Sequence, residues 1–99
     1  MLHIVNKSQA QTRSLESCLR LAQPGQSLLL IEDAVYAATA AGAAASGIAA
    51  ALARLKVYAL QPDLEARGMA GKLVEGVAAV DYGGFVDLVA DHKNSQSWL

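Results

Sequence analysis

The apolar run LLLI at residues 28–31 constrains the fold of this 99-residue chain more than any other segment. The run is continuously apolar, and the acidic pair Glu32 and Asp33 follows it at once. A strand with one solvated face alternates apolar and polar residues, whereas a strand that is covered on both faces is apolar throughout. The run therefore predicts a strand of a parallel sheet with helices on both faces.

Apolar segments alternate with helical segments along the rest of the chain. Strands are predicted at residues 2–5, 28–31, 56–60 and 76–80. Helices are predicted at residues 14–22, in one short turn after Asp33, and at residues 48–55, 62–67 and 82–92, with a loop near Gly42. A Ser or Thr is expected to cap the first helix, and Trp98 is expected to dock or to form an edge strand. The alternation predicts one α/β layered domain over residues 1–99, with a mostly parallel central sheet flanked by helices.

Composition and charge narrow the possible functions. Hydrophobic residues make up 54% of the chain and charged residues 17%, below the usual value of about 25%, so a disordered chain is not expected. The net charge of −1 gives no cationic surplus for direct nucleic-acid binding. No signal peptide or membrane span is recognised, and a single cysteine forms no internal disulfide, so we expect a cytoplasmic protein. A small apolar chain must expose apolar patches, which favours oligomerisation.

Acidic residues follow several predicted strands. Carboxyl ends of parallel strands meet at one edge of the sheet, where ligands commonly bind. Glu32, Asp33, Asp63 and Asp81 are expected near that edge. Gathered together, they would form a metal or acid–base site. Taken singly, they are helix N-caps, which is the commoner role of an Asp after a strand.

The remaining motifs give little evidence for a metal or phosphate site. His3, His92 and Cys18 lack the spacing of a zinc site, so no metal and no cofactor are predicted. Gly42 and Gly47 have the spacing of a phosphate-binding loop, but the Lys-Ser/Thr pair that should follow is absent.

The adjacent pair Gly83 and Gly84 lies where a predicted strand passes into a helix. It would either bind an anion at the helix N-terminus or simply permit a turn, and the turn is the commoner role.

Cys18 is the one candidate nucleophile. A thiolate here would carry sulfur as a persulfide after attacking a sulfur donor, and nearby Arg13 and Arg20 would lower its pKa. However, Cys18 shares a helix face with Leu15 and Leu19, and free cysteine is among the most buried residue types. The residues themselves favour a structural role and leave the catalytic one open.

Several segments in order resemble the DsrH/TusB family of sulfur-relay proteins. They are LHIVNKS at residues 2–8, LLLIEDAVYAA at 28–38, VYALQPDLEARG at 57–68, VDYGGFVDL at 80–88 and the terminal SWL. The resemblance covers nearly the whole chain, and the alanine-rich stretch at residues 39–53 is the least similar part.

The resemblance implies a DsrE-like fold and a subunit of a cytoplasmic hetero-oligomer. The partners would be TusC/DsrF-like and TusD/DsrE-like subunits, in a heterohexamer that passes persulfide sulfur to a downstream acceptor protein. The sulfur would go toward 2-thiouridine at the wobble position of tRNA, or serve dissimilatory sulfur oxidation. The main sulfur-carrying cysteine of such complexes belongs to the TusD/DsrE-like subunit, which implies an accessory role here, and the isolated chain would self-associate.

Two other functions stay open beside the accessory one. In the DsrH branch a cysteine occupies the position that matches Cys18, so the resemblance makes Cys18 a candidate persulfide-carrying sulfurtransferase site. A further alternative is a domain that binds a small molecule in the strand-end crevice around Asp33 and Asp81.

Overall fold

The computed structural model describes residues 1–98, and its sheet contains every strand that the sequence predicts. Within these residues the strands are β1 (Leu2–Val5), β2 (Ser27–Leu30), β3 (Lys56–Leu60), β4 (Ala78–Val80) and β5 (Ser95–Trp98). They are all parallel and lie in the order β4-β3-β2-β1-β5. The predicted α/β fold is confirmed, and so is the docking of Trp98 in an edge strand.

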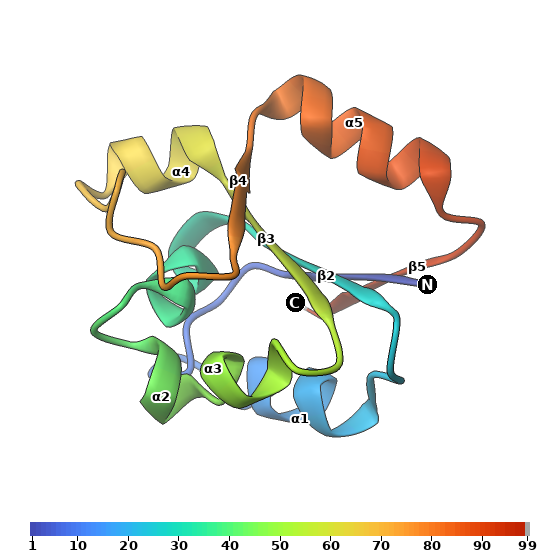
Figure 1. Cartoon of the computed structure of the whole chain (residues 1–99), viewed down its shortest axis with the longest axis horizontal. Coiled ribbons are helices and arrows are strands. Elements are labelled where there is room, and N and C mark those ends of the chain that lie inside the picture. The colour runs from blue at the N-terminus through green and yellow to red at the C-terminus, as the bar shows by residue number, and fades with distance from the viewer. Residues whose placement is uncertain (99) are drawn as a thin grey trace.

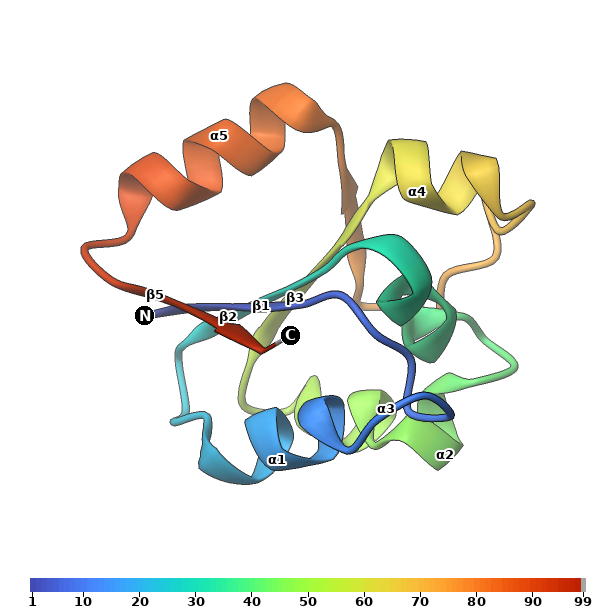
Figure 2. The same cartoon turned by 180° about the vertical axis from the view of Figure 1, so that it is seen from behind.

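Helices lie on both faces of this sheet (Figure 1). Helices α1 (Ser14–Leu21), α2 (Ala43–Ser46) and α3 (Ile48–Ala51) cover one face, and α4 (Gln61–Ala66) and α5 (Tyr82–Asp91) lie on the other. The view from behind shows the same two layers (Figure 2). Covering both faces explains why β2 is apolar at every position but its first.

The two faces are packed unequally. The main core lies under α1–α3, where Leu15 and Cys18 of α1 pack with Leu28 and Leu30 of β2. Side chains alternate along a strand, so Leu29 points to the opposite face, where it is also buried. There, however, α5 contains no buried residue. The layer under α5 is therefore the thinner one.

Residues 32–55, which include the alanine-rich stretch, differ most from their prediction. A 3₁₀ helix, η1 (Glu32–Ala38), takes the place of the expected short turn, and the helix predicted at residues 48–55 is only the single turn of α3. Gly47 has φ +88° between α2 and α3, a left-handed conformation that ends one helix before the next begins. A Cβ at Gly42 would lie 2.6 Å from the backbone oxygen of Tyr36. Both glycines therefore serve turns.

The expected Ser or Thr cap of α1 is wrong. Its N-cap is Arg13, which makes no side-chain capping bond. The hydroxyl of Thr12, one residue earlier, accepts a hydrogen bond from the Ser14 N–H at 3.3 Å. Over residues 1–98, no helix is both long and apolar enough to cross a membrane.

Candidate functional site

Two of the predicted acidic residues meet at the carboxyl edge of the sheet. Asp33, in η1, accepts a hydrogen bond from Arg67 Nε on its Oδ1 at 2.8 Å. Its Oδ2 accepts a second bond from Gln11 Nε2 at 3.0 Å. Asp33 thus connects the loop before α1 with the residue that follows α4.

Asp63 completes this cluster from the first turn of α4. Its Oδ2 accepts the backbone N–H of Glu32 at 2.7 Å, and its backbone oxygen accepts a bond from Arg67 at 3.3 Å. Glu32 has φ +50°, a left-handed conformation that costs a non-glycine residue of order 1 kcal/mol. The Asp63 carboxylate therefore helps to hold the chain in a strained turn at the end of β2.

The carboxylates of Asp33 and Asp63 at the strand ends are already paired with the guanidinium of Arg67. The hydrogen bond from Arg67 holds the pKa of Asp33 below its ordinary value, and the bond from Gln11 adds to this effect. The same pair raises the pKa of Arg67. A general acid needs a raised pKa, so Asp33 is not suited to that task. Over residues 1–98, no group of three His, Cys, Asp or Glu side chains is arranged to hold a metal ion.

Asp81 lies outside this cluster and caps α5. Its Oδ1 accepts the Gly84 N–H at 2.7 Å, so a carboxylate already occupies the helix N-terminus where an anion would bind. A Cβ at Gly84 would lie 3.0 Å from the Cβ of Val80, which explains the glycine by close packing. The geometry therefore argues against the anion site, and it places both glycines within the first turn of α5 rather than in a separate turn with positive φ.

The two histidines are each held by hydrogen bonds, His3 within β1 and His92 at the end of α5. His3 is buried in β1, and its Nε2 lies 2.8 Å from Gln26 Oε1. His92 follows α5, where Nδ1 lies 2.6 Å from the Leu88 backbone oxygen and Nε2 lies 3.2 Å from Ser27 Oγ. Each ring is occupied by structural hydrogen bonds.

Cys18 lies in the main core. It is 0% exposed, and its burial raises the pKa of the thiol to about 12, against a smaller lowering by the positive charge of Arg54. Arg54, just after α3, donates to the backbone oxygens of Leu19 and Ala22 at the end of α1, the second at 2.8 Å. The thiol therefore belongs to a packed layer rather than to an open site.

Sequence reasoning missed two neighbours of the candidate site residues: Arg54 beside Cys18, and Arg67 beside Asp33. The expectation that Arg13 and Arg20 would lower the pKa of Cys18 is wrong, because both side chains are exposed and the effect comes from Arg54. Arg54 is distant in sequence, so nothing in the chain signals this contact. For Arg67 the signal was its i,i+4 spacing from Asp63 on one helix.

Comparison with protein families gives a match that covers most of the chain. A family model described as DsrH, DsrH like protein, matches residues 7–95. Proteins named TusB from Pectobacterium parmentieri and Serratia proteamaculans are each 37% identical to the chain over 98 residues. The alignments cover 99% of this chain and 100% of each relative. A protein named TusB from Escherichia coli O81 is 36% identical over the same length.

Solved structures with the same fold include the ychN protein from E. coli. It has a TM-score of 0.76 and 19% sequence identity, covering 97% of both chains. A protein of unknown function, MTH1491 from Methanobacterium thermoautotrophicum, has a TM-score of 0.74 at 19% identity, covering 97% of this chain and 95% of its own. At this identity the similarity shows the fold, which agrees with the predicted DsrE-like architecture.

Proposed function

Because the chain belongs to the DsrH-like family, we propose that it is an accessory subunit of a cytoplasmic sulfur-relay complex. The observation that carries this proposal is the similarity to TusB proteins along the whole chain. The other subunits are TusC/DsrF-like and TusD/DsrE-like proteins in a heterohexamer. Sulfur passes through this complex as a persulfide toward tRNA wobble 2-thiouridine, or in the oxidation of sulfur compounds.

The state of Cys18 supports the accessory role. Only a thiolate attacks a sulfur donor efficiently. With a pKa of about 12, roughly one Cys18 thiol in 10⁵ is ionised at neutral pH, and its side chain is buried. A donor persulfide therefore has neither access nor a reactive nucleophile here unless the packing around α1 opens. We assign the persulfide to a related subunit.

Co-expression with the two related subunits tests the proposal directly. We expect all three chains to copurify, with native mass spectrometry giving a heterohexamer. We also expect a strain that lacks this chain to lose wobble 2-thiouridine or its capacity to oxidise sulfur, whichever pathway the complex serves. Failure to associate with either related subunit would exclude the proposed role.

Intact-mass measurement separates the accessory role from the alternative that Cys18 carries sulfur. In that alternative, a donor R–SSH transfers its outer sulfur to the Cys18 thiolate, leaving R–S⁻ and Cys18–SSH. We expect no such mass gain on the wild-type chain, while the TusD/DsrE-like subunit gains one sulfur in the same mixture. A gain on this chain that Cys18→Ala abolishes would make Cys18 a carrier.

A further inference from the structure

Helix α5 has an apolar stripe that nothing in the described chain covers. Tyr82, Val86 and Val89 are 62%, 65% and 41% exposed. Their spacing of four and three residues places them in one row along the helix. Phe85 and Leu88 are only half-buried on the inner side of the same helix. The helix is thus apolar on its outer face as well as its inner face.

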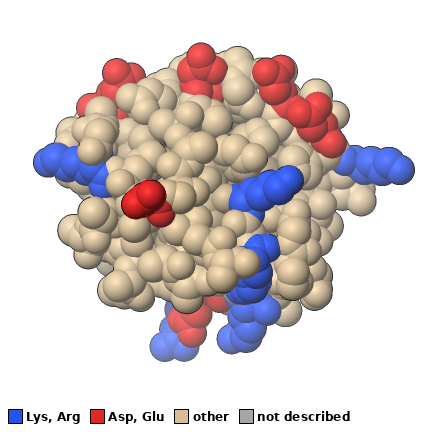
Figure 3. Space-filling model, viewed as in Figure 1, with Lys and Arg blue, Asp and Glu red and all other residues tan. Residues whose placement is uncertain are grey.

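Acidic residues border this apolar stripe. Asp81, Asp87 and Asp91 all lie in or next to α5, and residues 81–92 contain no Lys or Arg. The surface shows acidic side chains gathered along the edge formed by α4 and α5 (Figure 3). A partner that binds this stripe needs an apolar surface with a cation beside it.

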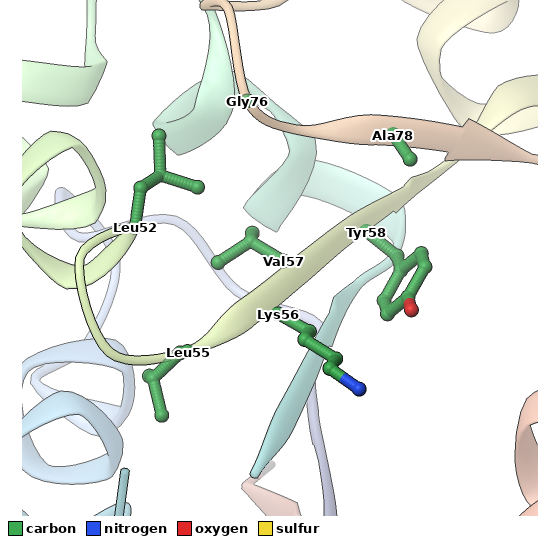
Figure 4. Close-up of a pocket in the computed structure, with 7 residues that line it drawn as sticks. All are labelled: Leu52, Leu55, Lys56, Val57, Tyr58, Gly76 and Ala78. Atoms are coloured by element: carbon green, nitrogen blue, oxygen red, sulfur yellow. The ribbon is translucent and has the colours of Figure 1, made fainter. Parts of the chain in front are cut away.

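A groove that is mainly apolar and has a lysine at its rim lies on the same chain. Its volume is about 300 Å³, and it is lined by Leu52, Leu55, Lys56, Val57, Tyr58, Gly76 and Ala78. It exists because β4 pairs with β3 only from Tyr58 onward, which leaves the first two residues of β3 without a neighbouring strand on that side. The sticks show Leu52 and Val57 on one side of β3 and the Lys56 side chain on the other, with its ammonium near Tyr58 at the rim of the groove (Figure 4).

We propose that the outer face of α5 docks into this groove of a second copy of the chain. Tyr82 or Val86 fills the apolar groove, and Lys56 at its rim pairs with Asp87 or Asp91 on the side of the helix. The charged residues within α5 are acidic, with Lys93 two residues beyond its end, and the groove offers apolar side chains with a lysine at the rim. The two surfaces are therefore complementary in both polarity and charge.

This contact joins different surfaces of the two copies. Each copy that donates α5 keeps its own groove free, and each copy that receives α5 keeps its own helix free. A contact of this kind closes into a ring or continues as a filament, and it does not stop at a symmetric dimer.

Complementary surface variants test the contact in the isolated protein. Val86→Glu removes the apolar stripe and leaves the groove, whereas Lys56→Glu spoils the groove and leaves the stripe; both residues are exposed. We expect the wild-type chain to sediment as species larger than a dimer, and each variant alone to be a monomer. A mixture of the two variants should form a 1:1 dimer, because one intact helix and one intact groove remain.

The matched control is Leu21→Glu, which changes another exposed apolar residue, 57% exposed, on α1, a helix that contributes no residue to the stripe or to the groove lining. It should associate like the wild type, and circular dichroism should show that all three variants are folded. A monomeric wild-type chain, an equal effect of the control, or a variant mixture that stays monomeric would each overturn the proposal. These outcomes leave the relay function intact, since that function fails only if the related subunits do not bind.

Discussion

Trp98, in the last strand, donates its indole Nε1–H to Nδ1 of His3, in the first strand, at 3.2 Å. Because Nδ1 accepts this bond, Nε2 of the neutral ring donates to Gln26 Oε1 at 2.8 Å. The same Gln26 oxygen accepts the Gln23 N–H at 2.9 Å. One continuous set of hydrogen bonds therefore ties the edge strand β5 to β1 and to the turn before β2.

Replacing Trp98 with Phe should weaken the attachment of β5. The variant loses the indole donor and leaves Nδ1 of a buried imidazole without its partner, which costs about 1–3 kcal/mol. Urea unfolding measures the loss. Gln96→Ala on the same strand, where the side chain is exposed, should change the free energy of unfolding by less than about 0.5 kcal/mol. Equal effects of the two substitutions would mean that the indole bond contributes nothing.

Two leucines on α1 should differ sharply when each is changed to Ala. Leu15 is 0% exposed in the main core, whereas Leu21 is 57% exposed. Leu15→Ala removes buried methyl groups and leaves a cavity, which costs about 2–5 kcal/mol. Leu21→Ala should stay within about 0.5 kcal/mol of wild type. Thermal or urea unfolding of the pair checks this, and a similar loss in both would contradict the packing of α1.

The sequence predicted the elements whose side chains carry a strong pattern. Continuous apolarity marked β2, and the spacing of Leu15, Cys18 and Leu19 marked the buried face of α1. The alanine-rich stretch was predicted poorly, because alanine gives a helix no distinct buried face. Its helices are set instead by tertiary contacts, such as the bond from Ser46 Oγ to the Ala37 oxygen at 2.8 Å.

The candidate site could be predicted only in part. That strand ends would gather Asp33 and Asp63 follows from the parallel sheet. The sequence does not predict the pairing of Arg67 with Asp33. The i,i+4 spacing of Arg67 from Asp63 says nothing about Asp33, which lies on another element. The position of Arg54 against the end of α1 depends on how α3 packs, and no local pattern records that.

Asp33→Asn should change how stability depends on pH. The pKa of Asp33 is lowered in the folded chain, mainly by the hydrogen bond from Arg67, so the charged carboxylate stabilises the fold. This contribution is fully present above the ordinary value of 3.8, and it is lost as the pH falls through the lowered value. The difference in unfolding free energy between wild type and variant should therefore shrink as the solution is acidified.

Glu65→Gln, an exposed change on α4, is the matched control for Asp33→Asn. It removes a carboxylate that forms no ion pair within residues 1–98. We expect little change in stability at any pH. If the stability of the Asp33 variant differed from wild type by the same amount at every pH, its effect would come from lost packing and not from the ion pair.

The thiol of Cys18 should react only when the chain opens. Burial raises its pKa from 9.0 to about 12, so the folded state keeps the proton while the unfolded state releases it. The resulting stabilisation is fully present below pH 9.0 and is lost as the pH rises through the folded value, a trend that Cys18→Ala should remove. At mildly alkaline pH an alkylating reagent should modify the native chain far more slowly than the chain in urea. Fast modification of the native chain would show that the core around α1 opens readily, and Cys18 would then have the access that a sulfur carrier needs.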